Sequence, residues 1–233
     1  GKQIIHNSYN IINDKIIVLG HGVDTNIFTH TEQTKKSDFI LMYSGSFVES
    51  YDFDLIINAA KKLQDENIKF VLRGKGILLS YLQNEKKNKD LKNLLIDTEI
   101  VPLEYIAKKL AHADVFIVPM KNEIALNSTL PTKILEYMSC GKPVLSTPLK
   151  GTVELLPNEN YGIVYSQQND FINSLILLFF VAVLISSLFH SINLFLKKTL
   201  CFVHMYFSFS FGIYFFDRFS GIQLLKKLDY INL

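Results

Sequence analysis

The sequence comprises 233 residues with a mass of 26.7 kDa, enough for one large domain or two small ones. Charged residues make up 20% and hydrophobic residues 48%, which excludes disordered, collagen-like and low-complexity chains. The net charge of +2 gives no broad cationic surface, so we expect no nucleic-acid partner. Cys140 and Cys201 match no zinc, redox or disulfide pattern, which favours a reducing compartment.

The first two thirds of the chain alternate short apolar runs with amphipathic segments. In chain order, the apolar runs predict strands at Lys15–Leu19, Phe39–Ser44, Ile68–Arg73, Leu94–Ile96, Val115–Pro119, Pro143–Thr147 and Gly162–Tyr165. Helical spacing of apolar residues predicts helices at Asp54–Asp65, Leu103–Ala111 and Pro131–Cys140. Because repeated strand–helix units imply parallel pairing, the predicted fold class is α/β, with a Rossmann-like, doubly wound parallel sheet.

The character of the sequence changes at about residue 168. We therefore predict a Rossmann-like unit over residues 1–168 and an apolar, mainly helical C-terminal segment over residues 169–233. Phe171–Leu196 and Thr199–Phe216 contain no charged residue, and either run could cross a bilayer, which takes about 20 apolar residues. Serine and histidine side chains within both runs count against a true span. Three interpretations stay open: a membrane hairpin, a buried pair of helices, or a sequence altered by a shift of reading frame.

The segment Ser128–Val144 has the pattern of a loop, a helix, a turn and a strand. Pro131 suits a first helical turn, Ser128 or Thr129 can cap it, and Gly141 supplies a left-handed stop.

Polar residues of the predicted helix share one face at its N-terminal end. Thr129, Thr132 and Glu136 are three and four residues apart, so they lie on the same side. The unpaired N–H groups near Leu130–Lys133 favour a phosphate, and Lys133 adds positive charge. Glu136 can accept hydrogen bonds from sugar hydroxyls. The same pattern also fits an ordinary capped surface helix with one solvated glutamate.

At this point the sequence resembles a known family. Leu130–Met138 with Gly141–Val144 resembles the donor-site signature of retaining GT-B glycosyltransferases (group 1, family 4-like), particularly those that build bacterial surface polysaccharides. The likeness extends over roughly Ile11 to Tyr165. Segments that agree with it in the expected order are Val18–Leu19, Gly22–Asp24 with Phe28, Tyr43–Gly45, Ile56–Leu63, Phe70–Gly76, Ala113–Val115 and Val118–Pro119.

The resemblance implies the C-terminal, nucleotide-sugar-binding domain of such an enzyme. It implies transfer of a sugar from a UDP- or GDP-type donor to a polysaccharide, lipopolysaccharide or glycolipid acceptor, with retention and without a metal or other cofactor. Glu136 would bind the ribose, the backbone around Leu130–Lys133 the diphosphate, and the Thr98–Val101 loop the base. The residues expected at the donor site are Gly45, Ser46, Arg73, Lys75, Thr98, Glu99, Ile100, Val101, Leu130, Pro131, Thr132, Lys133 and Glu136. No residue is assigned to catalysis.

The sequence also departs from the family pattern. Many relatives have an arginine directly after the glycine turn and a lysine five residues later, where this chain has Ser46 and Tyr51. Charge for the diphosphate would then come from Arg73, Lys75 or Lys133. Ser128 stands where many relatives carry a second acid.

The resemblance leaves the function of the chain itself open. We expect a glycosyltransferase that is split, truncated or works with a separate N-terminal acceptor domain. The alternatives are a noncatalytic nucleotide-binding remnant or subunit, and an epimerase of nucleotide sugars. Cytoplasmic localisation is implied, at or near the inner face of the cell membrane, with a nucleotide sugar and a glycan or lipid-linked acceptor as partners.

Overall fold

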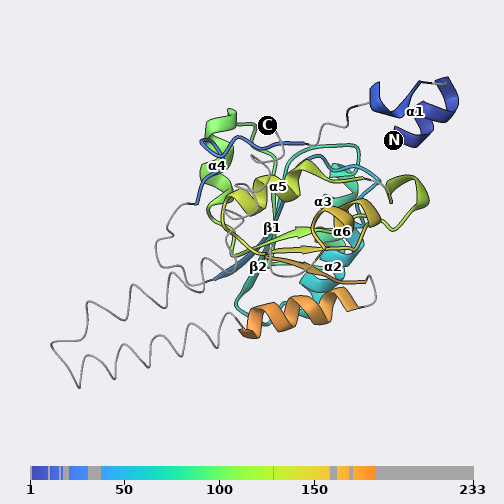
Figure 1. The fold of residues 1–233 in the computed structure, drawn as a ribbon. Coiled ribbons are helices and arrows are strands. Elements are labelled where there is room, and N and C mark those ends of the chain that lie inside the picture. Colours follow the sequence, from blue (N-terminus) through green and yellow to red (C-terminus); the bar gives the residue numbers. More distant parts are fainter. Residues whose placement is uncertain are drawn as a thin grey trace, which may run out of the picture.

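The computed structural model describes residues 2–9, 11–15, 17, 21–30, 38–127, 129–157, 162–167 and 170–181. Its centre is a parallel sheet of six strands in the order β3-β2-β1-β4-β5-β6 (Figure 1). This is the predicted Rossmann-like α/β fold. The strand order reverses between β1 and β4, where open parallel sheets bind their ligands. The strands are β1 (Phe39–Ser44), β2 (Ile68–Arg73), β3 (Leu94–Asp97), β4 (Val115–Val118), β5 (Val144–Ser146) and β6 (Ile163–Tyr165).

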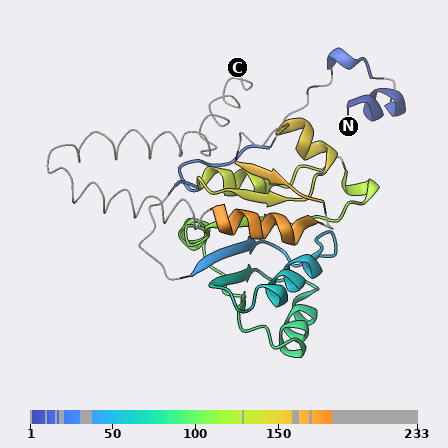
Figure 2. The ribbon, with the colours of Figure 1, turned by 90° about the horizontal axis from the view of Figure 1, so that it is seen from below.

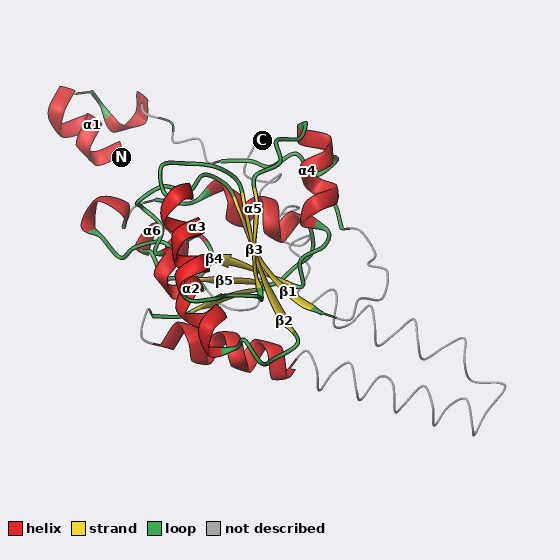
Figure 3. Ribbon diagram, turned by 180° about the vertical axis from the view of Figure 1, so that it is seen from behind, coloured by secondary structure: helices red, strands yellow, loops and turns green. Residues whose placement is uncertain are grey.

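Helices cover both faces of this sheet (Figure 3). They are α1 (Lys2–Tyr9), η1 (Asn13–Lys15), α2 (Phe53–Lys62), α3 (Leu79–Asn88), α4 (Leu103–Leu110), η2 (Ile124–Leu126), α5 (Thr132–Ser139) and α6 (Lys150–Leu155). Residues 171–181 are also helical, and Figure 2 shows this helix, in orange, lying over the sheet.

The core has two layers because alternate strand residues point to opposite faces of the sheet. One layer joins Leu41 and Tyr43 of β1 to α2, α3 and the helix at 171–181. The other joins Met42 and Phe116 to α4 and α5. The sheet is therefore buried on both sides, and its loops at the carboxyl ends of the strands carry the candidate site.

The strands β1 and β2 begin and end at the residues that the sequence predicts. The strand predicted at Lys15–Leu19 is wrong for the residues that the structure describes. Lys15 ends the 3-10 helix η1, while Ile17 lies in no strand and is 81% exposed. Residues 16, 18 and 19 lie outside the described residues.

The beginning of the apolar C-terminal segment packs against the sheet. Phe171 and Leu175 are fully buried, and the Phe179 ring meets the edge of Phe39 at a centroid distance of 5.4 Å. Within the described ranges, which end at residue 181, no helix is long and apolar enough to cross a membrane. Residues 182–233 lie outside these ranges, so the three interpretations of the segment stay predictions.

Candidate functional site

The loops that follow β1 to β4 bring the predicted site residues to one edge of the sheet. Gly45 and Ser46 follow β1, Lys75 follows β2, and Thr98–Val101 follow β3. The Leu130–Lys133 segment comes after β4 and opens α5. Since all strands are parallel, their carboxyl ends share this edge.

The helix α5 begins without a side-chain cap among the described residues. Pro131 is the N-cap residue, in an extended conformation, and the predicted cap by Thr129 is wrong. The backbone N–H of Thr129 donates to the Leu126 carbonyl, and the Thr129 carbonyl accepts from the Thr152 hydroxyl. Ser128 lies outside the described residues. No capping oxygen from the described chain therefore competes with an anion for the N-terminal end of α5.

The other end of α5 follows the prediction. Gly141 has φ +69°, and its N–H donates to the Met138 carbonyl. Ile134, Leu135 and Met138 are buried, and the helix does not fit the interpretation as an ordinary surface helix.

Two glycines allow the chain segments at this edge to approach closely. Gly45 has φ +148° and Gly74 has φ +140°, a conformation that other residues rarely adopt. A Cβ atom on Gly45 would lie 2.5 Å from the Lys133 Nζ atom, and one on Gly74 would overlap the Gly45 carbonyl. The missing side chain of Gly45 therefore leaves room for the Lys133 ammonium at the turn after β1.

Lys133 is held by two tyrosines. Its Nζ atom donates to the Tyr43 hydroxyl at 2.8 Å and lies 4.2 Å and 4.0 Å from the ring centroids of Tyr43 and Tyr51. Within the part of the chain that the structure describes, it forms no ion pair. Burial lowers the pKa of Lys133 to about 7, and the carboxylate of Glu136 opposes this shift.

The tyrosines stay neutral at physiological pH. Burial raises the pKa of Tyr51 to about 12 and that of Tyr43 above its usual range. The Tyr43 hydroxyl, which accepts from Lys133, donates to the Ser46 carbonyl at 2.7 Å. This chain of hydrogen bonds links α5 to the turn after β1. Sequence reasoning did not assign a role to either tyrosine.

Glu136 lies one turn beyond Lys133 on α5 and is half-buried, whereas Thr132 is exposed. Burial raises the pKa of Glu136, and Lys133 opposes that shift. Its carboxylate makes no hydrogen bond to any residue described in the structure. It is therefore available to a polar ligand that lies along α5.

Arg73 reaches the same edge, but its guanidinium binds other protein groups. It forms an ion pair with Asp97 at 2.6 Å and donates to the Glu99 carbonyl at 3.0 Å. The side chain of Arg73 is buried, so it fixes the start of the loop after β3. Lys75, by contrast, is exposed.

The loop after β3 presents little charge of its own. Glu99 pairs with Lys109 of α4 at 2.6 Å, while Ile100 is 79% exposed and Val101 is half-buried. An exposed apolar side chain next to backbone groups suits a flat, uncharged ring better than a phosphate.

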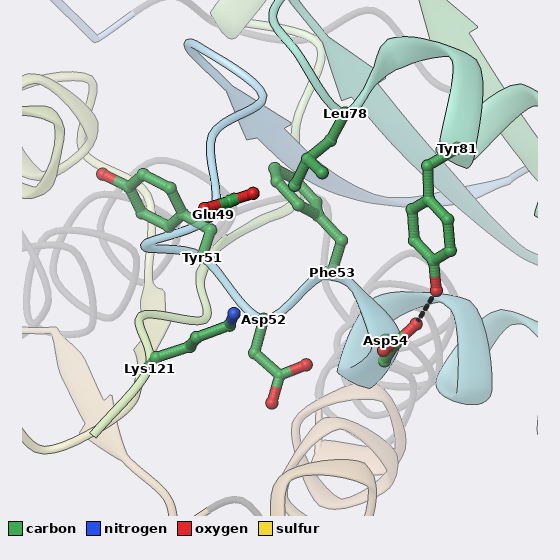
Figure 4. Close-up of a pocket in the computed structure, with 8 residues that line it drawn as sticks. All are labelled: Glu49, Tyr51, Asp52, Phe53, Asp54, Leu78, Tyr81 and Lys121. Atoms are coloured by element: carbon green, nitrogen blue, oxygen red, sulfur yellow. Dashed lines mark hydrogen bonds between the residues drawn. The ribbon is translucent and has the colours of Figure 1, made fainter. Parts of the chain in front are cut away.

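A cavity of about 260 Å³ lies beside the Lys133 site, and sequence reasoning missed it (Figure 4). Tyr51 lines the cavity and also contacts Lys133. On the opposite side of the cavity the Tyr81 hydroxyl donates to Asp54. The signal for this cavity in the sequence is the group of acidic residues after Gly45, namely Glu49, Asp52 and Asp54. The lining residues are Glu49, Tyr51, Asp52, Phe53, Asp54, Leu78, Tyr81 and Lys121.

No metal centre is found in the described ranges, where no group of three or more histidine, cysteine, aspartate or glutamate residues could hold an ion. Cys140 is buried at the end of α5, and burial raises the pKa of its thiol to about 11. It therefore packs as a small apolar residue.

Comparison with known proteins identifies relatives of this chain. The family model described as glycosyl transferases group 1 matches residues 25–178. A probable sucrose-phosphate synthase of Thermosipho melanesiensis is 30% identical over 185 residues, which are 73% of this chain and 42% of that protein. The chain spans less than half the length of the curated relatives it matches.

Solved structures share the fold. The C-terminal domain of a glycosyl transferase group 1 family protein from Francisella tularensis superimposes with a TM-score of 0.55 and 16% identity, covering 68% of this chain and 88% of that domain. The S. aureus TarM structure in complex with fondaparinux, alpha-GlcNAc-glycerol and UDP gives a TM-score of 0.55 and 17% identity, covering 76% of this chain and 34% of that one.

Proposed function

The chain belongs to the group 1 glycosyl transferase family, and on this basis we propose that it is the C-terminal, donor-binding domain of a retaining GT-B glycosyltransferase. The donor is a UDP- or GDP-type nucleotide sugar, and the acceptor a polysaccharide, lipopolysaccharide or glycolipid. The proposed place of action is the cytoplasm, at or near the inner membrane face, together with an N-terminal acceptor domain. The similarity to a solved C-terminal domain and to a UDP complex supports this proposal.

One observation carries the proposal. The start of α5, which has no side-chain cap from the described residues, the Lys133 ammonium and the Gly45 turn lie together at the reversal of strand order. All three favour the binding of an anion with several oxygen acceptors, such as a diphosphate. In this arrangement the N–H groups of α5 and Lys133 bind the diphosphate, with Gly45 and Ser46 in backbone contact.

Glu136 then accepts hydrogen bonds from the ribose, and the base lies on the Thr98–Val101 loop. The exposed Ile100 covers one face of the base. Arg73 contributes through the loop that it fixes, and Lys75 adds charge at the rim of the site.

Transfer breaks the bond between the sugar and the diphosphate, so negative charge builds up on the departing diphosphate. Lys133 and the positive end of the α5 dipole stabilise that charge. This proposed mechanism requires no metal or other cofactor.

The alternative is a nucleotide-binding remnant or subunit that binds the donor without turnover. It is favoured by one observation: Ser46 and Tyr51 stand where many members of the family carry an arginine and a lysine, so less positive charge is available to stabilise a departing diphosphate. Release of nucleoside diphosphate from a nucleotide sugar, measured with the full chain, separates turnover from binding alone.

Calorimetric titration of the full chain with UDP, GDP and ADP tests donor binding. We expect micromolar binding of one nucleotide, weakened about 10- to 100-fold in Glu136→Ala because a charged hydrogen-bond acceptor is lost. Glu154→Ala, which removes an exposed glutamate of α6, is the matched control and leaves the affinity unchanged. If a folded chain binds none of the three nucleotides, the proposed function is wrong.

A further inference from the structure

The Lys133 ammonium has an unusual environment for a half-buried cation. Charged groups that leave water are normally paired with an opposite charge. Here the described partners of the ammonium are the Tyr43 hydroxyl and the faces of two tyrosine rings. Aromatic faces attract a cation because the ring quadrupole places negative charge above the ring plane. They hold the ammonium in position without neutralising it.

The position of Tyr51 is itself fixed by contacts with the chain just after β4, the strand next to β1. Tyr51 forms an isolated bridge with Met120, just after β4, and the neighbouring Asp52 N–H donates to the Pro119 carbonyl at 2.7 Å. Its ring meets the edge of the Tyr43 ring at a centroid distance of 5.2 Å. The end of β4 therefore sets where the ring lies, and the ring sets where Lys133 lies.

The unused charge of Lys133 faces the Gly45 turn. Among the described residues, the charged or titratable groups that act on the ammonium are Tyr43 of β1, Tyr51 of the loop before α2, and Glu136 of its own helix. Both tyrosines are neutral, and Glu136 contributes only a longer-range attraction. In its charged form, which a bound anion would itself favour, Lys133 therefore keeps its capacity to bind an anion at the turn.

We propose that Tyr51 is a positioning residue, which acts with Tyr43 to hold the Lys133 ammonium at the Gly45 turn so that it binds the diphosphate of the donor. This inference rests on the proposed function, since it assumes that a diphosphate binds there. Tyr51 does not contact the diphosphate itself and acts on it only by positioning Lys133. Its effect on binding must therefore disappear when Lys133 is removed.

A double-mutant cycle in the full chain tests this dependence, with inorganic pyrophosphate and the preferred nucleoside diphosphate as probes. We expect Lys133→Met to weaken binding about 10- to 100-fold and Tyr51→Met about 3- to 30-fold. In the Lys133→Met background, Tyr51→Met should change the affinity by less than about twofold. Tyr51→Phe keeps the ring and should bind as the unaltered chain does.

A second measurement keeps the shape of the side chain constant. Pentafluorophenylalanine at position 51 reverses the charge on the ring face, so it should weaken binding relative to Tyr51→Phe without loss of folding. The matched control is Tyr105→Leu, which removes the surface contact of Lys108 with the Tyr105 ring and should leave pyrophosphate binding unchanged.

The outcomes separate the two ideas. If the unaltered chain binds neither probe, the proposed function fails. If it binds both and Lys133→Met weakens binding, but Tyr51→Met and the fluorinated ring have no effect, the positioning role of Tyr51 is wrong while the donor site stands. An equal effect of Tyr51→Met with and without Lys133 would also overturn the positioning role.

Discussion

The Tyr137 hydroxyl of α5 makes two hydrogen bonds to the backbone of Ser44, the last residue of β1. It donates to the Ser44 carbonyl at 2.7 Å and accepts from the Ser44 N–H at 2.8 Å. The ring of Tyr137 stacks on Phe116 of β4, with centroids 3.9 Å apart and planes inclined by 7°. The helix is thereby fixed to both strands at the reversal of strand order, and Lys133 and Glu136 are placed relative to Gly45.

Replacing Tyr137 with phenylalanine should lower the free energy of unfolding by about 1–3 kcal/mol, because two half-buried backbone groups lose their partner. Nucleotide affinity should fall as well, since α5 is no longer fixed at the turn. Tyr165→Phe is the control: its hydroxyl donates to the Leu156 and Thr152 carbonyls, away from the site. Urea unfolding should show a loss for both variants and calorimetry a loss of affinity for Tyr137→Phe alone.

Alanine at Gly45 should weaken pyrophosphate binding about 10- to 100-fold, as removal of the Lys133 charge does. The added Cβ atom meets the Lys133 Nζ atom at 2.5 Å, and φ +148° is strained for alanine. The lysine end must move away from the turn. Gly22→Ala is the matched control, because a Cβ atom there meets no described atom within 4 Å. An unchanged affinity in a folded Gly45→Ala variant would contradict the placement of the anion.

Methionine at Arg73 should lower the free energy of unfolding by about 3 kcal/mol, because Asp97 loses the partner of a largely buried ion pair. The loop after β3 should exchange its amide hydrogens faster, since the Glu99 carbonyl also loses its donor. Lys69→Met breaks the more exposed pair with Asp38 and should cost less than about 1 kcal/mol. Equal losses in urea unfolding would show that Arg73 has no special structural role.

The stability of the chain should rise between about pH 7 and pH 10. Burial lowers the pKa of Lys133 to about 7, below its ordinary value of 10.5, so in this window the unfolded chain binds more protons at Lys133 than the folded chain. The free energy of unfolding then increases with pH. Below pH 7 both states carry the charge, and the contribution levels off. Urea unfolding across this range should show that the free energy of unfolding rises more for the unaltered chain than for Lys133→Met. The same dependence on pH in both proteins would contradict the prediction.

The sequence predicts the sheet better than the site. The bounds of β1 and β2 follow from apolar runs that stop at Gly45 and Gly74. The helix α3 was missed because only Leu82 of its residues is buried, which leaves a polar segment without clear periodicity. The strand predicted at Lys15–Leu19 rested on apolar residues alone, and of its described residues Lys15 lies in η1 and Ile17 in no strand.

The environment of Lys133 could not be predicted, because it depends on residues distant in sequence. Tyr43 and Tyr51 meet the lysine only after β1 is placed beside β4 and α5 packs against both. The partner of Arg73 depends likewise on the pairing of β2 with β3, whose register places Arg73 opposite Asp97. A helical pattern did identify the polar face with Thr132 and Glu136, because that spacing is local.

The packing of the helix at 171–181 decides how the chain can be shortened for crystallisation or binding studies. Ending the chain before this helix would remove Phe171 and Leu175 from the core, at about 1.5–3 kcal/mol for each buried side chain. The part of the apolar core cluster that they cover would become exposed to solvent and prone to aggregation. A shortened protein should therefore retain residues 171–181.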